Sequence, residues 1–444
     1  MSVARSAGPE AATSTPVPRV GHPWMLPWRY ASGDHADRPH PMTSGIYGLR
    51  RLREPAFQRI VLVVLAVILV AFRLTQFLVW STRIQWGYDF SAYWTAASNL
   101  LHGLPIYIAD QLTGPYAPQR QFLYLYPPPL AGAVTPFAAL IPGDYRVAAW
   151  AWAALGFLIV ATSVLAVARS LGLPERVRSA TGHGPWILLV AALCFPPVVS
   201  ELVLGNVHVL LLGLLSVAWL GVRRGDGTGL RWAGIAVGLA AAVKVFPALL
   251  ILWFLLTGRR RAAVWSVIGG LAAVVVTLPI TGIQPWLDFP SALFNLSAPS
   301  DTTDTLAPTV WLASFIGFST ARVVVTVAAL GLLAWSARRL PTRQSFALAV
   351  LLSLLIAPAL YQHYLAITVL PFLLLLAEPN AFRWLVVAYI LMSGGEQTAY
   401  GDFAWIVNRG LPTAGTLILL WVAVRTGLTP AEASGWPASR AAVS

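Results

Sequence analysis

Long apolar runs separated by short arginine clusters constrain this chain more than any other feature. The first run covers residues 57–80, and similar runs recur up to residue 426. A helix of about 20 apolar residues crosses the hydrocarbon core of a bilayer. The composition agrees, with 57% hydrophobic residues, 11% charged residues and a mean hydropathy of +0.69. We predict an all-α integral membrane protein with about twelve transmembrane helices.

The arginines predict which loops face the cytoplasm. Arg50, Arg51 and Arg53 before the first run, and Arg59 at its start, place the N-terminus inside under the positive-inside rule. An even number of spans returns the C-terminus to the cytoplasmic side. We therefore expect a multi-pass plasma-membrane protein with both termini in the cytoplasm. The formal net charge of +13 is explained by these loop arginines, so nucleic acid is not expected as a partner.

Three regions follow from composition. Residues 1–55 are rich in Pro, Ser, Gly and Ala and are predicted to be a disordered cytoplasmic tail. Residues 56–427 form the predicted transmembrane domain, and residues 428–444 form a second disordered cytoplasmic tail. A long external segment, about 81–143, contains several prolines, and we expect interfacial or re-entrant helices there instead of a full span.

The run 232–257 raises a conflict with the positive-inside rule. It carries arginines at both ends, and a single helix would leave the arginines at 259–261 outside. The conflict disappears if "AAVKVFP" breaks the run into two half-spans, with Lys244 and Pro247 near an external apex. Every other basic residue among the lysines and arginines is arginine, which singles out Lys244.

With this topology, the informative polar residues gather on the external side. Ionisable groups at membrane depth cost roughly 2.5 to 3.5 kcal/mol each on insertion scales, so their gathering predicts a functional site. The set comprises Asp89, Tyr124, Tyr126, Glu201, Asn206, His208, Lys244, Asp301, Asp304, Tyr361, Gln362, His363, Glu396 and Asp402.

Asp89 is the candidate general base. It lies among Trp86, Tyr88, Tyr93 and Trp94, which would shield the carboxylate. The alternative is a capping aspartate, because "DFSAYWTAASNLLHG" is typical of a capped amphipathic helix ended by glycine. The aromatic residues likewise fit either an interfacial belt or a platform on which sugars stack.

Lys244 and His363 are candidates for contact with a phosphate group. A lysine supplies a point positive charge that suits a lipid phosphate, although it could instead extend to the headgroups. His363 in "YQHYLA" lies at a predicted external helix end, and a structural histidine is the alternative. HExxH, CxxC and paired DxD motifs are all missing from the sequence, so no metal site is predicted. A metal site at Asp301 and Asp304 is the alternative, and their stretch is also typical of a mobile loop.

Five segments together resemble glycosyltransferase family 87, over about residues 57–427. They are "YDFSAYWTAASNLLHGLPIY", "YLYPPPLAGAVTPFAALIP", "GNVHVLLLGLLSVAWLG", "GIAVGLAAAVKVFPALLILWFLLTGRRRAA" and "LLIAPALYQHYLAI". The resemblance implies a GT-C fold and an actinobacterial enzyme of lipoglycan synthesis that uses a polyprenyl-phosphate sugar and a glycolipid or polysaccharide acceptor. Gly205-Asn206-Val207-His208 stands where the family pattern has Gly-Gln-x-Asn, and Gln362-His363 stands where paired histidines often occur.

What the resemblance implies for the site is a catalytic base at Asp89 and donor-phosphate contacts from Lys244 and His363. The expected substrate-binding residues are Tyr88, Tyr93, Tyr126, Asn206, His208, Tyr361 and Gln362. The expected reaction is inverting transfer of mannose from polyprenyl-phosphate-mannose to form an α-linkage, without a cofactor or an obligatory metal. Transfer of arabinofuranose is the alternative, and a lipid or sugar transporter is the alternative of a different class.

Overall fold

The computed structural model describes residues 55–83, 86–116, 123–141, 143, 145–181, 184–295, 305–378, 380–394 and 406–428. These residues are predominantly helical and contain no β-strand, so the prediction of an all-α protein is confirmed. By its internal contacts the chain divides into residues 1–57 and 58–444, and all contacts discussed below lie in the second unit. Most of both predicted tails lies outside the described residues.

Five described helices are long and apolar enough to cross a membrane, which supports the prediction of a membrane protein. They are α2 (Pro55–Ser81), α6 (Tyr145–Ser170), α13 (Arg260–Thr281), α16 (Phe318–Arg339) and α20 (Leu411–Leu428), the last of which follows the π-helical turn η4 (Ile406–Gly410). A sixth span results if α8 (Trp186–Leu193) and α9 (Pro196–Leu204), which are bent by 61°, are counted as one.

The bend between α8 and α9 has a local cause. Pro196 and Pro197 occupy the first positions of α9, where proline is tolerated but cannot continue the preceding helix. The carbonyl of Cys194 at the bend accepts a hydrogen bond of 3.1 Å from Arg73 Nε of α2. An arginine within the first apolar helix therefore satisfies a backbone group that the bend leaves outside the regular helical pattern.

The predicted count of about twelve spans is not confirmed, because the remaining helices are shorter than a bilayer requires. Several end close to a proline, which interrupts the helical hydrogen bonding. The short helices outside the proline-rich segments are α7 (Leu173–Thr181), α10 (His208–Arg224), α11 (Gly227–Val243), η2 (Phe246–Ala248), α12 (Leu249–Leu256), α17 (Thr342–Leu355), η3 (Gln362–Thr368), α18 (Val369–Leu376) and α19 (Phe382–Met392).

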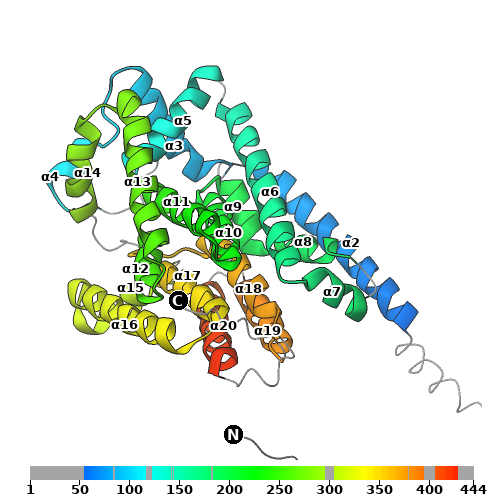
Figure 1. The fold of residues 1–444 in the computed structure, drawn as a ribbon. Coiled ribbons are helices and arrows are strands. Elements are labelled where there is room, and N and C mark those ends of the chain that lie inside the picture. Colours follow the sequence, from blue (N-terminus) through cyan, green and yellow to red (C-terminus); the bar gives the residue numbers. More distant parts are fainter. Residues whose placement is uncertain are drawn as a thin grey trace, which may run out of the picture. The chain divides into compact units, whose positions relative to one another are not determined.

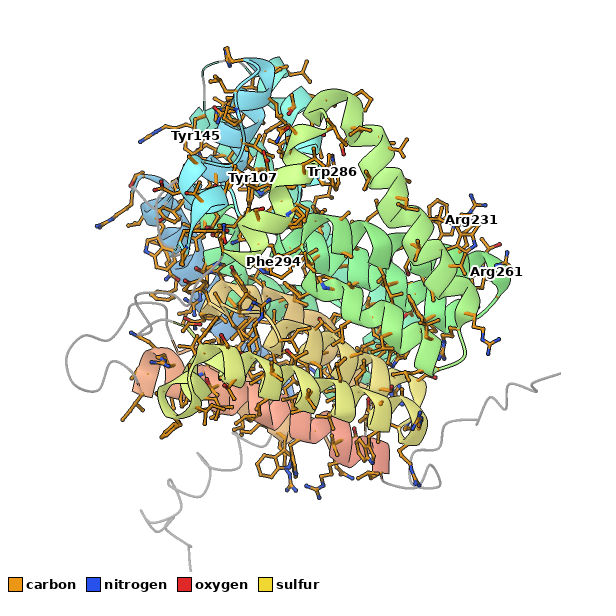
Figure 2. All side chains as sticks on the ribbon, turned by 90° about the vertical axis from the view of Figure 1, so that its left-hand side faces the viewer. Tyr107, Tyr145, Arg231, Arg261, Trp286 and Phe294 are labelled. Carbon is orange, nitrogen blue, oxygen red and sulfur yellow. The ribbon has the colours of Figure 1, made fainter. Side chains whose placement is uncertain are left out.

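The predicted break at Lys244 is confirmed. Helix α11 ends at Val243, Lys244 has an extended backbone, and the chain turns through η2 into α12. Helices α11 and α13 pack along each other, and Figure 2 shows Arg231 near the start of α11 beside Arg261 near the start of α13, away from Trp286 and Tyr107. The arginines on both sides of the break therefore lie at the same end of these helices, as the charge pattern requires.

Arginines from other loops contact residues at the same end of the helices. Arg259 Nη2 donates to Thr342 Oγ1 at 3.0 Å, Arg343 pairs with Glu378, and Arg176 Nη1 donates to the carbonyl of Ala377 at 2.6 Å. Lys244 lies 13 residues beyond Arg231 along α11, or about 20 Å at 1.5 Å per residue. The break at Lys244 is thus remote from the arginine-rich end of α11.

Short helices replace a span in the proline-rich segment that follows α2, as predicted. They are α3 (Tyr88–Leu101), α4 (Ala109–Thr113) and α5 (Pro128–Leu140); the later segment between α13 and α16 holds α14 (Gln284–Phe294) and α15 (Pro308–Ile316). Helix α5 packs against α3 and α13, and Figure 1 shows α3 and α5 close to the upper part of α6. This packing places α3, which carries Asp89, over the turn that joins α9 to α10.

Candidate functional site

Two glycines in the left-handed conformation place Asp89. Gly87, with φ of 65°, is the N-cap of α3 and donates its N–H to the carbonyl of Val203 in α9 at 2.8 Å. Gly205, with φ of 69°, ends α9, and a Cβ at that position would lie 2.7 Å from Cβ of Phe90. Only glycine combines that backbone conformation with so close an approach. Asp89 therefore sits in the first turn of α3, directly above the turn 205–208.

Asp89 is not the N-cap of α3, so the alternative of a capping role is wrong. The N-cap is Gly87, which has no side-chain cap, and the Asp89 carboxylate contacts Asn206 from another helix junction. The side chain of Asp89 is 23% exposed, so it is shielded but reachable. The helix N-terminus also favours its negative charge.

Asn206 is the hub of the site. Its Nδ2 donates to Asp89 Oδ2 at 2.8 Å and lies 3.3 Å from His363 Nε2. Its Oδ1 accepts hydrogen bonds from Tyr93 Oη at 3.2 Å, from Tyr126 Oη at 3.3 Å and from the N–H of Val207 at 2.6 Å. Because three donors converge on Oδ1, the amide group is fixed with its NH₂ toward the carboxylate.

The two tyrosine hydroxyls are held in their protonated, donating form. Burial raises the pKa of Tyr126 well above its ordinary value, and the nearby Asp89 carboxylate raises it further. Burial is also the main cause of the raised pKa of Tyr93, followed by its neighbour Tyr126 and by Asp89. Both hydroxyls therefore donate to Asn206 at neutral pH.

Lys244 occupies an aromatic cage. Its Nζ lies 3.8 Å from the ring centroid of Tyr364, 5.1 Å from that of Tyr126 and 5.8 Å from that of Phe246. It also lies 3.0 Å from His208 Nε2. A lysine extended to the headgroups would not make these contacts, so the ammonium group points into the protein.

His208 and Glu201 continue the network behind Lys244. His208 Nδ1 lies 3.3 Å from Glu201 Oε2, and both side chains are fully buried. Glu201 Oε1 accepts the backbone N–H groups of His208 and, at 3.3 Å, of Val209, which begin α10. The acid thus caps α10 with one oxygen and contacts the imidazole with the other.

Asp89 and Lys244 belong to one connected cluster. The path runs from the carboxylate through the Asn206 amide to the hydroxyl of Tyr126, whose ring faces the Lys244 ammonium. The turn 205–208 supplies both Asn206 on the Asp89 side and His208 on the Lys244 side. The predicted gathering of a carboxylate and the lone lysine in a single site therefore matches the geometry.

The segment "YQHYLA" divides its side chains between this cluster and other contacts. His363 Nε2 lies 3.5 Å from Asp89 Oδ2, so the structure places His363 beside the carboxylate. The Tyr361 ring stacks parallel to the His363 ring, with centroids 5.8 Å apart. Gln362 instead directs its Nε2 toward the backbone carbonyls of Met392, at 3.2 Å, and Gly394, away from the cluster.

The other predicted residues are placed as follows. Tyr88 is 38% exposed on the first turn of α3 next to Asp89, and its partial burial and that carboxylate raise its pKa. Tyr124 is buried and donates to the carbonyl of Pro127 at 2.6 Å. Asp301, Asp304, Glu396 and Asp402 lie outside the described residues, among which no group of three or more potential metal ligands occurs.

Three residues of the cluster lacked an assigned role in the sequence interpretation. Tyr364 and Phe246 form two walls of the cage, and Glu201 supports His208. Tyr364 and Phe246 are neighbours of His363 and Lys244 in "YQHYLA" and "KVFP", which is a usable signal. An acid within the apolar stretch of α9 was likewise visible in the sequence, but its partner on α10 depends on the bend and turn.

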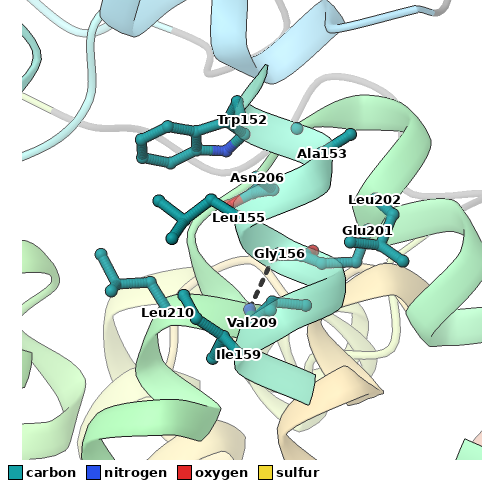
Figure 3. Close-up of a pocket in the computed structure, with 11 residues that line it drawn as sticks. Trp152, Ala153, Leu155, Gly156, Ile159, Glu201, Leu202, Asn206, Val209 and Leu210 are labelled. Atoms are coloured by element: carbon teal, nitrogen blue, oxygen red, sulfur yellow. Dashed lines mark hydrogen bonds between the residues drawn. The ribbon is translucent and has the colours of Figure 1, made fainter. Parts of the chain in front are cut away.

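A small cavity lies behind the cluster, between α6 and the junction of α9 with α10 (Figure 3). Trp152, Leu155 and Gly156 of α6 line one side, and Glu201 and Asn206 line the other. Its volume of about 20 Å³ holds at most one water molecule, whereas ligand sites are typically several hundred Å³. A gap of this size is too small for a sugar.

Comparison with known proteins identifies the family. The sequence model of glycosyltransferase family 87 matches residues 124–358, more than half of the chain. The matched range includes Tyr126, Glu201, Asn206, His208 and Lys244. Searches of curated proteins and of solved structures gave no match. The protein is a membrane glycosyltransferase and belongs to glycosyltransferase family 87.

Proposed function

We propose that the protein transfers a mannosyl residue from polyprenyl-phosphate-mannose to a hydroxyl group of a glycolipid or polysaccharide acceptor. The observation that supports this most is the connected cluster of Asp89, Asn206, Tyr126 and Lys244. It provides a carboxylate that can accept a proton and an ammonium group that can hold a phosphate. The distance of Lys244 from the arginine-rich end supports a site at the external face.

The chemistry follows from what the leaving group needs. The acceptor hydroxyl loses its proton to the Asp89 carboxylate while its oxygen forms a bond to C1 of the sugar. The bond from C1 to the phosphate oxygen breaks, and its electron pair leaves with the polyprenyl phosphate. Lys244 neutralises the phosphate charge, a task that requires neither a nucleotide nor an obligatory metal. A single displacement inverts C1, so a β-linked donor gives an α-linked product.

The remaining side chains fit roles around these two groups. His363 beside Asp89 can hydrogen-bond to the acceptor or to the donor phosphate, and the exposed ring of Tyr88 offers a surface on which a sugar can stack. Asn206 orients Asp89 through the protein, so its contribution need not involve direct contact with the substrate.

The test uses purified protein in detergent or nanodiscs, where no gradient exists to drive transport. Polyprenyl-phosphate-mannose and polyprenyl-phosphate-arabinofuranose are each supplied with labelled glycolipid acceptors, and the anomeric configuration of the product is read by NMR. The expected result is an α-mannosylated product. An arabinofuranosyl product would replace the donor assignment, and failure with both donors would overturn the proposal.

Asp89→Asn is the decisive variant. Removal of a general base typically lowers the rate by roughly a hundred- to ten-thousand-fold. Asparagine keeps the size of the side chain, so the thermal midpoint of the purified protein serves as the folding control. Transfer at the wild-type rate by a folded Asp89→Asn protein would refute the role of Asp89 as base.

A further inference from the structure

A buried acid that the proposed reaction does not use lies behind Lys244. Glu201 is only 1% exposed, and its two oxygens have different tasks. Oε1 accepts the N–H groups of His208 and Val209 and so caps α10. Oε2 is 3.3 Å from the His208 imidazole. A cap alone would explain the first oxygen but not the second.

With Lys244 charged and His208 neutral, each hydrogen bond along this array has one possible direction. An ammonium group has three donors and no acceptor, so Lys244 Nζ donates to His208 Nε2 across 3.0 Å. The ring proton of neutral His208 must then be on Nδ1, where it donates to Glu201 Oε2. Glu201 therefore stabilises the one tautomer of His208 that can accept from a charged Lys244.

The surroundings make this contact important for the lysine. Aromatic rings of Tyr364, Tyr126 and Phe246 surround Nζ, and rings attract a cation without fixing the direction of its N–H groups. A hydrogen bond to Nε2 does fix that direction. The Tyr364 ring also packs on His208, with centroids 3.8 Å apart, which holds the imidazole itself.

We infer that Glu201 is a positioning residue, which acts through the Nδ1–H tautomer of His208 to orient the Lys244 ammonium toward the anionic phosphate of the lipid donor. This inference rests on the proposed function. It assigns Glu201 to the donor-phosphate side of the site, although it has no direct contact with substrate. The turn 205–208 then serves both sides, with Asn206 orienting the carboxylate and His208 the ammonium.

Glu201→Gln separates the two tasks of the acid. A glutamine can keep its oxygen toward the N–H groups of α10, so the cap is retained. Its NH₂ group then faces His208 Nδ1, which must become an acceptor, and the ring proton moves to Nε2, where it opposes the ammonium. We expect binding of a sugar-free polyprenyl phosphate, in nanodiscs of zwitterionic lipid, to weaken by about tenfold or more. KM for the donor should rise by a similar factor, with a smaller change in kcat.

Two further measurements make the result specific. Nitrogen-15 NMR of labelled histidine, assigned with His208→Gln, should report the Nδ1–H tautomer in the wild type and Nε2–H in Glu201→Gln. In the His208→Gln background, Glu201→Gln should change binding by less than twofold, because its route to Lys244 is already lost. Equal effects of Glu201→Gln in both backgrounds would overturn the inference.

His208→Phe covers the case in which Glu201→Gln does not fold. Phenylalanine keeps a ring against Tyr364 but removes both nitrogens, so it should weaken phosphate binding about as much as Glu201→Gln. Wild-type binding of the lipid phosphate by His208→Phe or by Glu201→Gln would overturn the inference. So would an unchanged His208 tautomer in Glu201→Gln. Each of these outcomes would leave the proposed function intact. A wild-type protein that neither binds the lipid phosphate nor transfers sugar would refute the proposed function itself.

Discussion

Replacing Asn206 with alanine removes the amide that holds the Asp89 carboxylate. The lost bond, 2.8 Å long, joins an amide N–H to a charged oxygen, and such bonds contribute about 1.5 to 3 kcal/mol. At 1.4 kcal/mol for each tenfold change, kcat should fall by about 10- to 100-fold if the whole contribution is expressed in the transition state. The amide reaches Lys244 through the Tyr126 hydroxyl rather than directly, so KM for the donor should change less than kcat.

The assay is steady-state transfer of labelled sugar by purified protein in nanodiscs, with donor and acceptor varied in turn. Tyr126→Phe is the matched control, because it removes one hydroxyl from Oδ1 at 3.3 Å but keeps both the amide and the ring that faces Lys244. One neutral hydrogen bond contributes about 0.5 to 1.5 kcal/mol, so its effect should be roughly two- to twelvefold at most. An unchanged kcat in Asn206→Ala, or a loss confined to KM for the donor, would refute the orienting role and favour direct contact with substrate.

Two more predictions concern stability. Gly205→Ala should lower the thermal midpoint, since strained backbone costs about 1 to 3 kcal/mol and the added Cβ would lie 2.7 Å from Cβ of Phe90. Gly103→Ala is the control for the backbone contribution alone, because Gly103 has φ of +69° but no atom within 4 Å of the new Cβ. Equal losses in both variants would contradict the steric argument. Burial and Asp89 raise the folded-state pKa of Tyr126 above its unfolded value of about 10, so the unfolded chain loses this proton first. Unfolding free energy should therefore be insensitive to Tyr126 below about pH 10 and decline above it, and Tyr126→Phe should reduce that decline in denaturant titrations followed by circular dichroism.

Sequence patterns predicted the features that charge and proline determine locally. The break at Lys244 followed from arginines on both sides of one apolar run, together with Pro247, and α11, η2 and α12 have that arrangement. The short helices in the segment after α2 followed from its prolines. The number of spans was not predictable in this way, because hydropathy does not distinguish a full span from a short helix buried among others, such as α17 or α18.

The sequence predicted which residues belong to the site better than it predicted which contacts they make. Asp89, Asn206, His208 and Lys244 were expected together from the side of the membrane on which they fall. The orientation of Gln362 toward the end of α19, and the position of His363 beside Asp89, depend on how η3 packs against its neighbours. Such tertiary contacts leave no periodic signal in a single sequence.

The turn from Gly205 to His208 has a mechanical consequence. Asn206 and His208 are two residues apart, and one contacts the Asp89 carboxylate while the other contacts the Lys244 ammonium. A shift of this turn would carry both partners along together, so the separation between the Asp89 carboxylate and the Lys244 ammonium depends on a short stretch of covalent chain. Under the proposed function, acceptor preference can then change through the surrounding helices without altering the distance between the carboxylate and the ammonium group.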